Sequence, residues 1–191
     1  MFQRLLTRLK RTLCLQQQRK EFQPDSFVRL AKVQRWQHEG NGNTSTVEKA
    51  VADLKLRPGE KALSLYRLRK EGEIGELACV YSLTLRDNPA HFEYVLFPAS
   101  VLSGYRVDPV SVPEHPRLLS ERHHEIPDPS EEELLRLAER IFGSPGKKVG
   151  RITRRQIVDF AVQHSLLETE ELRDRIGHTW RKLIEKKKGI P

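Results

Sequence analysis

The residues best suited to chemistry in this sequence are basic side chains near its C-terminal end. A glycine-rich stretch and the residues that follow it hold five of them, Lys147, Lys148, Arg151, Arg154 and Arg155. Glycines let a backbone approach a phosphate closely, and Lys and Arg side chains neutralise its charge. This pattern predicts contact with the phosphates of a nucleic acid. The stretch is not a P-loop, because neither lysine is followed by Ser or Thr.

A second basic group lies on a predicted pair of helices. Periodic apolar residues indicate one helix that starts after Thr153 and another from Thr169 to Lys188, with a tight connection at residues 166–168. A helix-turn-helix unit has this arrangement, and its second helix enters the major groove of DNA. Four side chains would then face phosphates or bases: Arg173, Arg175, Arg181 and Lys182. The alternative is an ordinary helix pair whose apolar stripes are core.

The order helix, glycine-rich loop, basic residues and helix around residues 143–155 resembles the loop with which KH modules clamp a nucleic-acid backbone. The resemblance covers only these few residues, and Pro145 lies inside the loop. It implies a role in nucleic-acid binding for the same lysines and arginines. The alternative is a solvated loop between two helices.

Four histidines form a further pattern. His91, His115, His123 and His124 offer ligand types for zinc or iron, but their spacing matches no familiar motif, so the sequence predicts no metal and no cofactor.

Asp87 and Glu93 lie near the ends of two predicted strands. A helix followed by three strands is similar to the core of PD-(D/E)xK nucleases, which need a lysine two positions after the second acid. This chain has Val95 at that position, so no catalytic residue is predicted.

The elements that must position these residues begin with a sheet. Alternating side chains predict strands at Lys61–Lys70, Glu76–Arg86 and His91–Phe97, with the clearest alternation in the second. Thr44–Leu54 has the spacing of a short helix, whereas Phe27–Trp36 fits neither period. Two capping boxes, Ser130 with Glu133 and Thr153 with Gln156, mark the starts of C-terminal helices.

The predicted fold class is therefore α+β, an antiparallel β-meander with flanking helices and a C-terminal helical subdomain. We divide the chain into a basic amphipathic helix (1–22), an α+β domain with the three-stranded meander (23–112), a Pro-rich linker (113–129) and a helical subdomain (130–191).

Charge and composition narrow the class of partner. The net charge is +8 and the sequence pI is about 9.7, which favours polyanions. Residues 1–20 contain six basic side chains and no acidic one on an amphipathic pattern. Three interpretations stay open for them: a helix docked on the sheet, a mitochondrial presequence, or an arm that binds a membrane surface or nucleic acid.

The expected function is non-enzymatic nucleic-acid binding, to DNA or RNA, through the C-terminal basic residues. One alternative is an assembly or adaptor protein whose basic ends bind an acidic protein or a membrane surface. A metal-dependent, nuclease-like hydrolase comes third. Two cysteines and no long apolar run indicate an intracellular protein, cytoplasmic or, if residues 1–20 are a presequence, in the mitochondrial matrix.

Overall fold

The computed structural model describes residues 25–37, 47–56, 58–70, 72–86, 88 and 90–189. The fold is α+β, with an antiparallel sheet and a C-terminal helical part, as the sequence predicts. The basic amphipathic segment, residues 1–22, lies outside the described residues.

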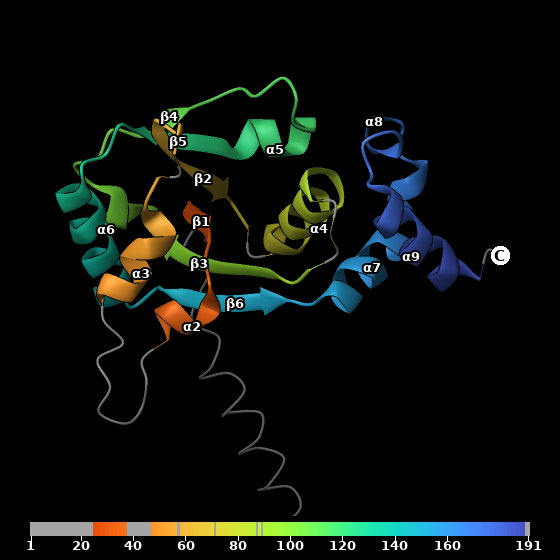
Figure 1. The fold of residues 1–191 in the computed structure, drawn as a ribbon, viewed down its shortest axis with the longest axis horizontal. Coiled ribbons are helices and arrows are strands. Elements are labelled where there is room, and N and C mark those ends of the chain that lie inside the picture. The colour runs from red at the N-terminus through yellow and green to blue at the C-terminus, as the bar shows by residue number, and fades with distance from the viewer. Residues whose placement is uncertain are drawn as a thin grey trace, which may run out of the picture.

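Six strands among the described residues form one sheet in the order β4-β5-β2-β1-β3-β6, and every neighbouring pair is antiparallel (Figure 1). The strands are β1 (Ser26–Leu30), β2 (Ala62–Leu68), β3 (Phe92–Pro98), β4 (Asp108–Pro109), β5 (His123–Pro127) and β6 (Lys148–Ile152). The first and third predicted strands are confirmed as β2 and β3. They do not belong to one meander, because β1 lies between them and pairs with both.

The predicted middle strand, Glu76–Arg86, is wrong. Residues 76–85 belong to helix α4 (Glu73–Leu85), which is buried on most of its sides, and Arg86 follows the end of that helix. Its buried side chains are Leu77, Ala78, Cys79, Val80, Ser82 and Leu83. A helix enclosed all round carries apolar residues on every face, so a stretch of it also fits a period of two.

Helices cover both faces of the sheet. On one face α2 (Val33–Trp36), α3 (Val47–Leu54) and α6 (Glu131–Gly143) share a core with Leu65 and Phe97. On the other face α4, α5 (Arg117–Arg122), α7 (Arg154–Gln163) and α9 (His178–Lys188) share a core with Val28 and Leu68. Figure 1 shows α7, α8 and α9 together at the right of the view, beyond α4.

Residues 113–129 do not form the linker that the sequence predicts. They contain α5 and β5, and β5 pairs with both β2 and β4 inside the sheet. Prolines suggested an irregular segment, but here they mark element ends: Pro116 precedes α5, and Pro127 closes β5. The segment 130–191 also contributes to the sheet, because β6 pairs with β3.

The two predicted capping boxes are confirmed. Ser130 caps α6 and Thr153 caps α7, each with both reciprocal hydrogen bonds in place. The predicted helix Thr169–Lys188 is broken, however, into α8 (Glu170–Arg173) and α9. At the break, the Gly177 N–H donates to the Leu83 carbonyl at 3.0 Å, which ties the start of α9 to α4.

None of the helices in the described part of the chain combines the length and the apolar character needed to cross a membrane.

The buried side of α4 gives a stability test. Leu83 is 1% exposed, so Leu83→Ala should lower the free energy of unfolding by about 2–5 kcal/mol, the usual cost of a cavity at a buried leucine. Leu135→Ala on α6 is the matched control, because Leu135 is 37% exposed and its loss should change little. Urea denaturation of both variants measures the difference. Equal effects would place Leu83 outside the core.

Candidate nucleic-acid interface

The first lysine of the glycine-rich stretch is held by the protein itself. Lys147 Nζ lies 4.2 Å from the centre of the Phe142 ring and donates a hydrogen bond to the Trp36 carbonyl at 3.2 Å. The Phe142 ring stacks on the Trp36 indole with centres 5.3 Å apart. Lys147 therefore joins the end of α6 to α2, and its ammonium already has partners that stabilise the fold.

Half of the predicted loop is the edge strand β6. Arg151 lies opposite Glu93 of β3, and its Nε donates to Glu93 Oε1 at 2.7 Å. Gly150 lies opposite Tyr94, and a β-carbon there would overlap the Tyr94 side chain. This glycine makes room for an aromatic ring. The loop expected from the KH resemblance is thus replaced, from Lys148 onward, by a paired strand.

The helix-turn-helix interpretation is not supported. Between α7 and α9 lie the 3₁₀ turn Leu166–Glu168 and helix α8, rather than one tight connection. Arg175 Nη1 donates to the Glu114 carbonyl at 2.5 Å, and the Arg181 guanidinium donates to the Arg173 carbonyl. These arginines fasten the α8–α9 connection, and none of them lines the groove between α7 and α9.

A groove of about 350 Å³ runs between α7 and α9 and collects basic side chains from both helices. We call it the α7–α9 groove. Its lining residues are Arg154, Arg155, Val158, Asp159, Leu183, Lys186 and Lys187. The two helices pack through Val158 and Leu183, and Lys187 Nζ lies 3.0 Å from Asp159 Oδ1, so the helices are held side by side.

Burial of α9 fixes the groove in place. Trp180 is fully buried, and its indole Nε1 donates to the Arg86 carbonyl at 3.2 Å, at the end of α4. Ile184, one turn later, is also fully buried. Lys186 and Lys187, in the last turn that follows, are exposed.

The last turn of α9 and the first turn of α7 both carry positive side chains, but the helix dipole favours them only in α9. Lys186 and Lys187 lie in the last turn of α9, where positive charge complements the helix dipole. Arg154 and Arg155 lie in the first turn of α7, where positive charge opposes the dipole, and that turn holds no acid. Arg155 has a weak compensation in its exposed pair with Asp159, four residues later on α7, at 3.8 Å.

Sequence reasoning found only part of this groove. Arg154 and Arg155 were among the predicted residues, whereas Lys186 and Lys187 were not, although the run Lys186–Lys188 is visible in the sequence. Lys182 lies one turn before Lys186 on the same side of α9. The sequence predicted two neighbouring helices here, but not the face on which their basic side chains meet.

The histidines do not come together as a metal site, and no group of three metal-ligating side chains occurs among the residues the structure describes. His115 and His123 lie near each other, with ring centres 5.9 Å apart, and the Nδ1 of each is buried with no hydrogen-bond partner within the part of the chain that the structure describes. Burial lowers the pKa of both imidazoles, and the neighbouring His115 and His124 lower the pKa of His123 further.

The acidic pair of the hydrolase alternative is not formed by the described residues. Glu93 is engaged by Arg151, and Asp87 lies outside the described residues. The three consecutive strands that this alternative requires are absent as well, because α4 replaces the middle one.

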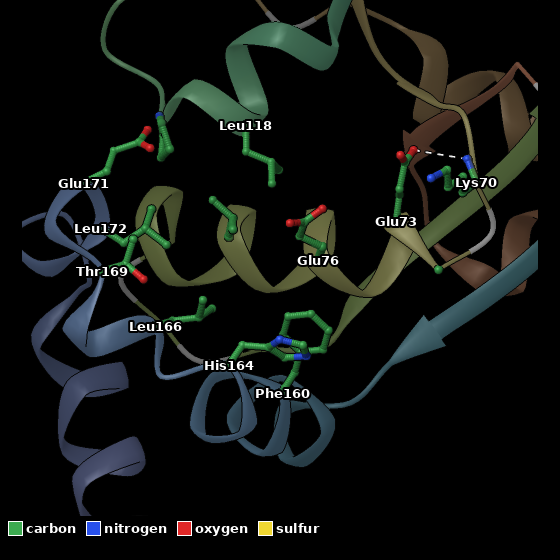
Figure 2. Close-up of a pocket in the computed structure, with 13 residues that line it drawn as sticks. Lys70, Glu73, Glu76, Leu118, Phe160, His164, Leu166, Thr169, Glu171 and Leu172 are labelled. Atoms are coloured by element: carbon green, nitrogen blue, oxygen red, sulfur yellow. Dashed lines mark hydrogen bonds between the residues drawn. The ribbon is translucent and has the colours of Figure 1, made fainter.

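A larger cavity, about 670 Å³, lies between α4, α5 and α8 (Figure 2). Figure 2 shows Leu118 above it and the stacked rings of Phe160 and His164, 4.1 Å apart, below it. The carboxylates at its rim already have protein partners: Glu76 pairs with Arg122 at 2.9 Å, and Glu171 accepts from the Arg117 N–H. The cavity is therefore mainly an apolar hollow between helices.

In comparisons with known proteins, no protein-family model, no curated protein and no solved structure matches the chain.

His115 and His123 predict a pH-dependent stability. Their pKa is lower in the folded state than the ordinary value near 6.5, so the unfolded chain binds more protons below that pH. Stability should be complete above about pH 7 and should fall as the pH drops through 6.5 towards the folded pKa. Urea unfolding of His123→Gln between pH 7.5 and 5 should show a weaker dependence than the native protein. His178→Gln, at an exposed position on α9, should keep the native profile; an identical profile for His123→Gln would contradict this account.

Proposed function

We propose that the protein binds nucleic acid without catalysing a reaction on it, and that the α7–α9 groove contacts the phosphate backbone. The observation that carries this proposal is the position of Arg154 and Arg155 at the start of α7, opposite Lys186 and Lys187 of α9. These arginines oppose the helix dipole, so a negative ligand would relieve an unfavourable arrangement of charge.

The balance of charge in the groove favours a polyanion. Asp159 is the one acid among its lining residues, and it already has two partners, Lys187 at 3.0 Å and Arg155 at 3.8 Å. The Arg155 side chain is 86% exposed, so its pairing is weak and easily exchanged for a phosphate. Arg154 and Lys186 are exposed as well. Backbone contacts of this kind supply affinity without reading the base sequence.

We also propose that the protein is intracellular, and the buried free thiol of Cys79 supports this. Cys79 is a free thiol inside the core, where burial raises its pKa to about 12. Its Sγ donates to the Ile157 carbonyl at 3.5 Å, between α4 and α7. The thiol acts as a small packed side chain, which fits a reducing compartment.

The salt dependence of binding tests the proposal. Each neutralised phosphate releases condensed counterions, so the plot of log affinity against log salt has a slope of about −0.9 per phosphate on duplex DNA. The double variant Arg154→Gln, Arg155→Gln should weaken binding to all sequences about equally and reduce the slope by about two. Fluorescence anisotropy with labelled duplex DNA and with single-stranded RNA, over a range of salt, measures both quantities.

The control is a charge change of equal size away from the groove. Arg136→Gln with Arg140→Gln removes two positive charges from α6 and should leave the slope unchanged. An unchanged slope for the α7 variant, at an unchanged melting temperature, would remove the groove from the interface. If the native protein binds neither nucleic acid at low salt, the function proposal fails, and an acidic protein or membrane surface becomes the partner to test.

A further inference from the structure

We propose that a second site, separate from the α7–α9 groove, binds a small phosphorylated molecule that also carries a hydroxyl group. The site is a pocket of about 560 Å³ at one end of the sheet, a volume in the usual range of small-molecule sites. We call it the arginine–histidine pocket. Its polar lining consists of Arg67, Arg69, Glu73, Glu121, Arg122 and His124. The proposal does not depend on nucleic-acid binding.

The register of the sheet builds this pocket. Phe27 of β1 lies directly opposite Arg67 of β2, and His124 of β5 lies opposite Leu65, two residues before Arg67. Residues that face each other across antiparallel strands share a face, as do residues two apart on one strand. Arg67 and His124 are therefore diagonal neighbours on one face. The Phe27 and His124 rings meet edge to face with centres 5.5 Å apart, which sets the floor of the pocket.

His124 presents a hydrogen-bond acceptor to the pocket. The side chain is nine-tenths buried, and its Nδ1 lies 3.0 Å from the Arg122 carbonyl. A carbonyl oxygen accepts only, so this contact requires the proton on Nδ1, and the tautomer that carries it there holds a lone pair at Nε2. Among the described residues Nε2 has no hydrogen-bond partner, and His124 lines the pocket. A ligand hydroxyl could donate a hydrogen bond to this Nε2 atom.

Two arginines supply the positive charge. Arg67 donates through Nε and Nη2 to Asp25 Oδ1, at 3.1 and 2.8 Å, and within the described ranges its Nη1 has no hydrogen-bond partner. Arg69 is exposed, and its guanidinium has no partner among the described residues. Arg fits phosphate well because its planar donors match two oxygens at once.

The carboxylates of the pocket are engaged in holding its walls. Glu73 Oε2 accepts from the backbone N–H groups of Arg69 at 2.7 Å and Lys70 at 3.2 Å, which fixes the turn that carries Arg69. Glu121 Oε1 accepts from Arg117 Nε at 2.5 Å. Arg122 pairs with Glu76 at 2.9 Å. These pairs leave Arg67, Arg69 and His124 as the groups that face a ligand.

The required ligand thus has acceptor oxygens for two guanidinium groups and a hydroxyl for Nε2. Inorganic phosphate at pH 7.5 has both, because it keeps a P–OH group, whereas sulfate has acceptor oxygens only. The two ions are close in size and shape, so their comparison isolates the lone pair of His124. We expect the pocket to prefer phosphate over sulfate by about tenfold or more, the value of one hydrogen bond to a charged group.

The experiment is an NMR titration of the full chain at pH 7.5 with sodium phosphate, and separately with sodium sulfate at equal ionic strength. Phosphate should shift the ¹⁵N signal of His124 Nε2 and the amide signal of Arg69 with one common binding curve. Arg69→Gln should weaken this binding about tenfold, and Arg136→Gln, on α6, should not.

Three results would overturn the proposal: no saturable shift at His124, equal affinity for phosphate and sulfate, or an unchanged affinity in Arg69→Gln. Shifts confined to Arg154, Arg155 and Lys187 would also overturn it, since phosphate would then occupy the α7–α9 groove alone. The variant Arg154→Gln, Arg155→Gln separates the two proposals, because it should lose nucleic-acid affinity and keep the shift at His124.

Discussion

The rest of the structure depends on the need to bury both faces of one antiparallel sheet. The strands carry large apolar side chains on each side, such as Leu65 and Phe97 on one and Val28 and Leu68 on the other. Water must be excluded from both faces, and helices from distant parts of the chain do this. α4 has to lie between the sheet and the C-terminal helices, which is why it is apolar on nearly every side. Trp180 then anchors α9 to the end of α4, and α7 and α9 meet with their basic residues outward.

This constraint explains what the sequence could and could not predict. Local signals worked where the chemistry is local: the capping boxes at Ser130 and Thr153 mark two helix starts, and alternation marks β2 and β3. They failed for α4, because a helix enclosed on all sides loses the period of 3.6 that distinguishes it from a strand. They also failed for β5, whose place in the sheet depends on pairing with β2, far away in the chain. Periodicity predicted the pair of helices that contains α7 and α9, but not the break at α8 or the face on which the two helices meet.

The structure also divides the basic residues by what each one does. Lys147, Arg151 and Arg175 hold parts of the fold together through an aromatic ring, a carboxylate and a carbonyl, respectively. Because these contacts stabilise the fold, the three positive charges are no evidence for a nucleic-acid ligand. Arg154 and Arg155 differ, since positive charge in the first turn of α7 opposes the helix dipole, and the exposed pair of Arg155 with Asp159 offsets this only weakly. Residues that oppose a local rule are the ones where function is expected, which is why we propose the α7–α9 groove as the binding surface.

The most direct test of the central claim is a map of the bound surface. Amide chemical shifts of the full chain, recorded with and without a short duplex DNA or single-stranded RNA, report which backbone segments meet the ligand. The account predicts that the perturbed amides cluster in the first turn of α7 and the last two turns of α9, and that α8 and β6 change little. Perturbations centred on Arg173 and Arg175, or spread evenly over the molecule, would contradict the claim that the α7–α9 groove is the interface.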